Sequence, residues 1–160
     1  MRIYLAGPLG FSEAGRAFHE GVIKPGIEAL GHIALDPWTL NDPAEIAAVA
    51  GLPYGPEKRD RWRELNTAIG RSNTEAIDTC DIVFAVLDGT DVDSGTAAEI
   101  GYAYARGKRI LGYRGDFRLS ADNEGSTVNL QVEYFIDRSG GFIISSIEAL
   151  NEALRALSAR

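Results

Sequence analysis

A run of apolar and β-branched residues at Asp81–Leu87 is followed, after a short loop, by a stretch of small residues that begins at Ser94. The first run predicts a strand that is buried on both faces, and the second predicts a helix that can pack closely against it. Parallel sheets covered by helices are built from such strand–helix units. This pairing restricts the chain to an α/β architecture more strongly than any other feature of the sequence.

Strand and helix patterns alternate along the chain, without repeats or a low-complexity linker. Strands are predicted at Arg2–Ala6, His32–Leu35, Asp81–Leu87, Arg109–Tyr113 and Gly141–Ser145. Helices are predicted at Ser12–Leu30 with a break at Pro25, at about Glu57–Thr79, from Ser94, and from Ile147, whereas residues 42–56 give no clear pattern. We therefore expect one domain over residues 1–160. Its expected fold is a three-layer, flavodoxin-like or Rossmann-like sandwich, with a parallel sheet of about five strands and helices on both faces.

Composition and charge exclude several functions. Lys and Arg number 16 against 23 Asp and Glu, and the net charge of −7 argues against binding to a nucleic acid polymer. The only histidines, His19 and His32, have no partner at a zinc-ligand spacing, and Cys80 cannot form a disulfide within the chain. No apolar stretch approaches the roughly 20 residues that span a bilayer. We expect a soluble cytoplasmic protein that needs no metal or other cofactor and no membrane.

Two carboxylates, Asp93 and Glu99, lie six residues apart at the predicted strand-to-helix junction. Ligands of open α/β sheets bind at this edge, where the strands end. The helix dipole and the free amides near a helix N-terminus favour the ionised form of Glu99, and an ionised glutamate can act as a nucleophile. The alternative is that Asp93 or Ser94 only caps the helix and Glu99 is an ordinary acid of its first turns.

Other segments at the same edge carry weaker signals. The loop Gly7–Phe11 matches no dinucleotide or phosphate-binding motif, and Pro8 removes one backbone donor. Phe11 and Trp38 follow the first and second strands, where their rings either stack on a nucleobase or pack in the core. The acidic stretch Asp88–Asp93 is as compatible with a solvated loop as with Mg²⁺, so we predict no metal site. The loop from Gly112 to Thr127 either shapes the site or only connects elements.

Four segments together resemble the nucleoside 2-deoxyribosyltransferases. They are Ile3–Pro8, Asn73 with Asp81, the stretch from Asp88 to Ala103 with its D-S-G-T-x-x-E-x-G-Y-A string, and Val128–Leu130. The resemblance extends from Met1 to about Phe135. It implies an enzyme of nucleotide salvage that exchanges nucleobases on 2′-deoxyribonucleosides, through a covalent deoxyribosyl-glutamate intermediate and with retention. Its partners would be nucleosides, free nucleobases and further copies of the same chain, with a dimer as the minimum unit.

The resemblance also implies a role for individual residues. Glu99 would be the nucleophile, Tyr4 would hold its carboxylate, and Asp93 would assist at the sugar hydroxyl or at the departing base. Asn129 would reach into a neighbouring subunit and bind the 5′-hydroxyl. We also expect Gly7, Phe11, Trp38, Asn73 and Gly95 to contact the substrate. The family commonly has Asp where this chain has Asn73, and because an amide cannot be a general acid, Asp93 or water would have to protonate the base.

Two other functions remain open. A 2′-deoxynucleoside 5′-monophosphate N-hydrolase has similar carboxylate geometry but transfers the sugar to water. It needs a phosphate pocket after the first strand, and Gly7–Ala14 contains Pro8, Phe11 and Glu13 instead. A non-catalytic nucleotide sensor can use the same fold, since a fold does not determine function. The presence of Tyr4, Asp93 and Glu99 together favours an enzyme.

Overall fold

A computed structural model describes residues 1–158, so Ala159 and Arg160, the end of the expected domain, lie outside the described residues. In this part of the chain, five parallel strands form one sheet in the order β2-β1-β3-β4-β5. The strands are β1 (Arg2–Ala6), β2 (Ile33–Leu35), β3 (Ile82–Val86), β4 (Arg109–Tyr113) and β5 (Phe142–Ile144). This is the flavodoxin-like order, in which the chain reverses direction across the sheet between β1 and β3.

Burial on both faces explains why β1 and β3 lie at the centre of the sheet. All five residues of β3 and the last four of β1 are buried. Tyr4 is paired with Val83 and Leu5 with Phe84, so neighbouring side chains alternate between two separate hydrophobic cores. The predicted parallel sheet with covered faces is therefore confirmed.

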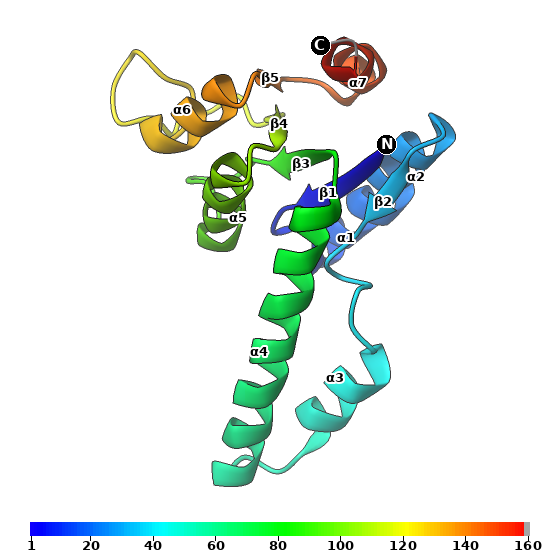
Figure 1. Cartoon of the computed structure of the whole chain (residues 1–160). Helices are drawn as coiled ribbons and strands as arrows, with labels where there is room; N and C mark the ends of the chain where they lie inside the picture. The colour runs from blue at the N-terminus through cyan, green and yellow to red at the C-terminus, as the bar shows by residue number, and fades with distance from the viewer. Residues whose placement is uncertain (159–160) are drawn as a thin grey trace.

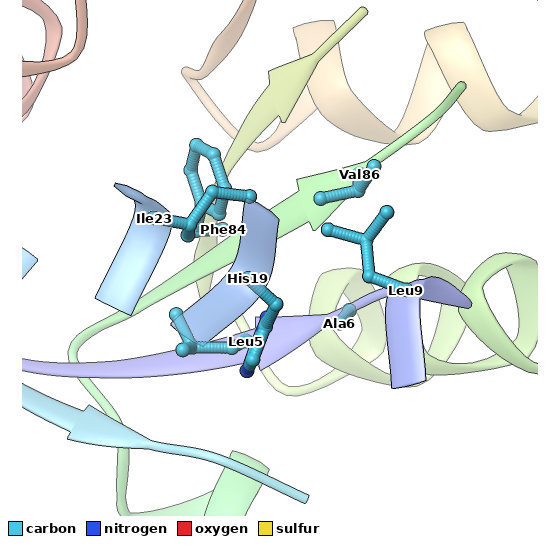
Figure 2. Close-up of a pocket in the computed structure, with 8 residues that line it drawn as sticks. Leu5, Ala6, Leu9, His19, Ile23, Phe84 and Val86 are labelled. Atoms are coloured by element: carbon cyan, nitrogen blue, oxygen red, sulfur yellow. The ribbon is translucent and has the colours of Figure 1, made fainter. Parts of the chain in front are cut away.

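Helices cover both faces of the sheet (Figure 1). One face packs against α4 (Pro56–Thr79), α5 (Ser94–Ala105) and α6 (Leu130–Arg138). The other packs against η2 (His19–Ile23), α2 (Lys24–Ala29) and α7 (Leu150–Ser158), with α1 (Glu13–Phe18) preceding η2. Short 3₁₀ turns, η1 (Leu9–Phe11) and η3 (Ile147–Ala149), connect these elements. Figure 2 shows the second core, where Leu5 and Phe84 of the sheet face His19 and Ile23 of η2.

The predicted break at Pro25 is wrong. Helix α1 continues through the π-helical segment η2 into α2, and Pro25 lies in the first turn of α2. A proline offers no N–H, and in an α-helix its ring would clash with the carbonyl of Gly21. The widened turn immediately before Pro25 accommodates this mismatch without ending the helix.

Residues 42–56, which gave no clear pattern, include a helix, α3 (Pro43–Gly51). Asp42 caps it by accepting a hydrogen bond from the amide of Ala44 at 2.8 Å, and Pro43 occupies its first position. Together with the first half of α4, α3 extends away from the sheet as an arm (Figure 1). Among residues 1–158, no helix is both long enough and apolar enough to cross a bilayer.

Candidate active site

A cavity of about 510 Å³ lies between the ends of the strands and the arm. Its lining residues come from five segments of the chain: the loop after β1, the turn after β2, α3, one face of α4 and the start of α5. The cavity therefore lies at the carboxyl edge of the sheet, next to the reversal between β1 and β3. This is the position at which open α/β sheets bind ligands.

A hydrogen bond joins the first strand to α5 at the cavity wall. The Tyr4 hydroxyl donates to Glu99 Oε1 at 2.7 Å, although 95 residues separate the two in the sequence. Tyr4 is fully buried on β1, and Glu99 lies in the second turn of α5 and lines the cavity. Parallel pairing of β1 with β3 brings the two together, because α5 follows β3 and packs over the same face of the sheet.

The acidity of Glu99 differs from the sequence prediction. We expected the helix N-terminus to favour the carboxylate, but burial raises the pKa of Glu99, and the nearby charge of Asp93 raises it further. The hydrogen bond from Tyr4 acts in the opposite direction and lowers this pKa. Burial, followed by the charge of Glu99, raises the pKa of Tyr4 far above its ordinary value, so the phenol remains a proton donor. Desolvation outweighs the helix end because Glu99 lies beyond the first turn.

Asp93 is both the helix cap and part of the cavity wall. Its Oδ2 accepts hydrogen bonds from the Thr96 amide at 3.0 Å and from the Thr96 hydroxyl at 3.2 Å. The same side chain lines the cavity beside Glu99. The sequence left open whether Asp93 only caps the helix or belongs to the site. The two interpretations are compatible, because both capping hydrogen bonds go to Oδ2.

The other residues predicted to contact substrate from these segments also line the cavity: Gly7, Phe11, Trp38, Asn73 and Gly95. The rings of Phe11 and Trp38 meet edge to face, with their centroids 4.8 Å apart. Asn73 presents a buried Oδ1 that has no hydrogen-bond partner among the described residues. A buried acceptor without a partner is costly, so this oxygen is suited to accept a hydrogen bond from a ligand.

The model of the nucleoside 2-deoxyribosyltransferase family matches residues 3–131. The chain belongs to this family. Family members act on nucleosides and nucleobases, so membership indicates an enzyme that acts on a glycosidic bond.

Solved structures agree with the family fold. A conserved protein of Enterococcus faecalis V583 matches over 98% of both chains, with a TM-score of 0.69 and 26% identity. The 2-deoxyribosyltransferase of Leishmania mexicana matches over 99% of this chain and 97% of its own, with a TM-score of 0.64 and 24% identity. The CMP N-glycosidase of Clostridium botulinum matches over 98% of both chains, with a TM-score of 0.55 and 20% identity. The same fold thus occurs in a transferase and in a glycosidase.

Asn129, the remaining residue implied by the family resemblance, lies outside this cavity. It caps α6, where its Oδ1 accepts hydrogen bonds from the amides of Gln131 at 3.0 Å and Val132 at 3.4 Å. The cavity of one chain is therefore formed without Asn129.

Sequence reasoning missed one wall of the cavity. Trp62, Asn66 and Ile69 line it together with Asn73. Their spacings of four, three and four residues place all of them on one face of α4, and this periodicity is visible in the sequence. Asn41, also in the lining, accepts a hydrogen bond at 3.1 Å from the Ser72 hydroxyl of α4.

Two carboxylates of the acidic stretch before α5 accept hydrogen bonds from backbone amides of the chain. Asp88 accepts a hydrogen bond from the Asp116 amide at 2.9 Å, and Asp91 accepts one from the Val92 amide at 2.7 Å. Arg114, which is buried in the loop after β4, donates to the carbonyls of Leu87 and Gly89 and so fixes the segment between β3 and α5. Within residues 1–158, no group of three or more His, Cys, Asp or Glu side chains is arranged to hold a metal ion.

Proposed function

We propose that this protein is a nucleoside 2-deoxyribosyltransferase that exchanges nucleobases on 2′-deoxyribonucleosides through a covalent bond between Glu99 and the sugar. The observation that carries the proposal is the hydrogen bond of 2.7 Å from the buried Tyr4 to Glu99, which lines the cavity together with Asp93. A tyrosine that remains protonated can orient one carboxylate oxygen and leave the other to attack.

The reaction then takes place in two displacements. The Glu99 carboxylate attacks C1′ of the sugar, and the N-glycosidic bond breaks with its electron pair passing to the base, which gains a proton from Asp93 or from water. A second base attacks C1′ from the opposite face, loses a proton, and displaces Glu99. Two inversions give retention of configuration, as in retaining glycosidases. Burial of Glu99 assists attack because a poorly hydrated carboxylate gives up less solvation when it forms a bond.

The charge of the cavity supports a nucleoside as substrate rather than a nucleotide. Among the described residues that line it, Asp93 and Glu99 are the only charged side chains. A 5′-phosphate would bring its negative charge close to two acidic groups with no cation to neutralise it. The remaining wall offers aromatic rings and amides, which suit an uncharged base.

The proposal extends to the cellular role and the assembly of the protein. Residues 1–160 would act as one domain in nucleotide salvage in the cytoplasm, without a cofactor, and as a homo-oligomer. Asn129 would complete the site of a neighbouring subunit at the sugar 5′-hydroxyl.

The test is chromatography of deoxyinosine or thymidine incubated with the protein, with and without adenine or cytosine as acceptor. Transfer predicts a new deoxynucleoside with the β-configuration, ping-pong kinetics, and a sugar adduct on the intact protein by mass spectrometry. Glu99→Ala should lower turnover roughly a thousandfold or more. Release of 2-deoxyribose alone would indicate an N-glycosidase, and binding without an adduct or product would indicate a sensor.

A further inference from the structure

Trp38 forms part of the cavity wall and is held by its surroundings on two sides. We call residues 36–41 the Trp38 turn. The Trp38 ring lies against the backbone of Gly10, where an added Cβ would come within 2.2 Å of the ring, and it meets the Phe11 ring edge to face. The turn follows β2 and crosses to α4, where Asn41 accepts the hydrogen bond from Ser72.

The backbone of the Trp38 turn is fixed by Asp36, a carboxylate that is only 3% exposed. Its Oδ1 accepts a hydrogen bond from the Trp38 amide at 3.1 Å. Its carbonyl accepts hydrogen bonds from the Thr39 amide at 2.9 Å and from the Thr39 hydroxyl at 3.1 Å. Asp36 therefore fixes the position of the turn and of the backbone from which the Trp38 side chain projects.

Two basic side chains face the other oxygen of Asp36. His19 Nε2 lies 3.2 Å from Oδ2, and Lys24 Nζ lies 3.5 Å from it. Burial raises the pKa of Asp36, but the contact with His19, the Trp38 amide and Lys24 together lower it below its ordinary value, so the group is a carboxylate. His19 belongs to the π-helical segment η2 and is itself buried, with its ring beside Leu5 (Figure 2).

Stability alone is a weak reason for a buried carboxylate at this position. Moving a charge from water into the protein interior is costly, and apolar residues of similar size often stabilise a core at least as well. Oδ2 faces His19 and Lys24, whereas Oδ1 accepts a hydrogen bond from the amide of Trp38 in the cavity wall. The pair thus connects η2 and α2, which do not line the cavity, to an aromatic ring that does.

We propose that Asp36, held by His19 and Lys24, is a positioning residue that fixes the Trp38 ring as a wall for the nucleobase. This inference rests on the proposed function in so far as the cavity receives a base. Asp36 does not line the cavity, so it acts through Trp38 and not by contact with the substrate.

The test uses the full chain and three variants. Asp36→Ala removes the acceptor for the Trp38 amide, whereas Asp36→Asn keeps an oxygen at that place. Asp78→Asn is the matched control, because Asp78 accepts from Tyr102 and Arg106 at the far end of α4, away from the cavity. We expect Asp36→Ala to raise KM for thymidine or deoxyinosine about tenfold while kcat changes by no more than about twofold. Asp36→Asn should restore most of the affinity. Asp78→Asn should leave KM unchanged.

Fluorescence of Trp38 gives an independent readout. In a Trp62→Phe background Trp38 is the sole tryptophan. We expect Asp36→Ala to shift its emission to the red, to lower its anisotropy, and to weaken its quenching by adenine. Asp36→Asn should resemble the parent. If Asp36→Ala leaves KM, emission and anisotropy unchanged while lowering stability as Asp78→Asn does, Asp36 is only structural and the inference is wrong.

A second variant keeps the inference testable if Asp36→Ala does not fold. Thr39→Val removes a single hydroxyl from the same turn and should give a smaller rise in KM, about twofold to threefold, with a partial loss of anisotropy. No change in either quantity would contradict the inference. The two proposals fail separately: a parent protein without turnover contradicts the proposed function, while adenine quenching that depends on the residue at position 36 still supports the role of Asp36.

Discussion

The protein holds Glu99 where its ionisation is costly. Burial and Asp93 raise the pKa of Glu99, so the folded state binds this proton more tightly than the unfolded chain does. The stability that a raised carboxyl pKa contributes is fully present below the unfolded pKa and is lost as the pH rises through the folded pKa. At neutral pH the ionised form of Glu99, which the proposed reaction requires, therefore destabilises the fold. A site that buries a charged group in this way trades stability for activity.

Glu99→Gln should therefore separate activity from stability. Glutamine keeps an oxygen that can accept from Tyr4 but stays neutral at every pH. We expect transfer to fall roughly a thousandfold or more, and the thermal midpoint at neutral pH to rise by about 2–4 °C. The midpoint difference should shrink as the pH falls below the range in which an ordinary carboxyl titrates. Glu75→Gln, an exposed change on α4, is the control and should move neither quantity. A Glu99→Gln protein less stable than the parent at neutral pH would contradict this account.

Asn73 gives a second prediction at the scale of one residue. An amide presents a fixed donor and a fixed acceptor, whereas a carboxylate only accepts until it is protonated. Asn73→Asp should therefore change the ratio of kcat/KM between deoxyinosine and thymidine, and should add a titration to the acidic limb of the pH profile. Steady-state rates over a pH series measure both effects. Asn151→Asp, at an exposed position on α7, is the matched control. An unchanged base preference together with an unchanged pH profile would remove Asn73 from the base site.

At the scale of elements, Asp93 caps the start of α5 in addition to the chemical role that we propose for it. Asn is as good a helix cap as Asp, whereas Ala is a poor one. Asp93→Asn should thus unfold in urea at nearly the parental midpoint, and Asp93→Ala should lose about 1 kcal/mol. Both variants should lose activity, because neither retains a carboxylate beside Glu99. Equal activity of Asp93→Asn and the parent would limit Asp93 to capping.

Elements with a strong periodic signal were predictable, and those set by tertiary context were not. The bounds of β1 and β4 were predicted at the residues observed, and α4 begins one residue before its predicted start. The break at Pro25 was wrong because a π-helical turn is not visible in an apolar pattern. Helix α3 was missed because it lies in the arm, away from the sheet, and has only Val49 fully buried.

Some features of the candidate site could likewise be predicted from the sequence, and others could not. The contact of Tyr4 with Glu99 followed from parallel strands and the family resemblance, since Tyr4 lies on β1 and Glu99 lies on the helix that follows the neighbouring strand β3. The raised pKa of Glu99 could not be predicted, because it depends on how far the arm and the sheet bury the carboxyl. The contact between His19 and Asp36 joins residues 17 positions apart that share no ligand spacing. Only the pairing of β1 with β2 and the packing of η2 bring them together.

At the scale of the whole molecule, the surface around Asn129 is more apolar than an isolated chain requires. Leu130 and Tyr134, four residues apart on one face of α6, are each 50% exposed. Exposed apolar side chains of this size mark interaction surfaces when they occur together. A second copy that covered this surface would bring Asn129 towards a neighbouring chain, which agrees with the role that the family resemblance implies.

This predicts that two inactive variants restore each other. Glu99→Ala removes the proposed nucleophile, and Asn129→Ser removes the amide while keeping a side chain that caps α6, so both should fold. Each should be nearly inactive alone. After equal mixing and subunit exchange, half of the dimers would be mixed, and one of the two sites in each would contain both Glu99 and Asn129. Activity should thus recover to about a quarter of the parental value. Native mass spectrometry confirms the exchange, and mixed dimers without recovered turnover would mean that each site is made within one chain.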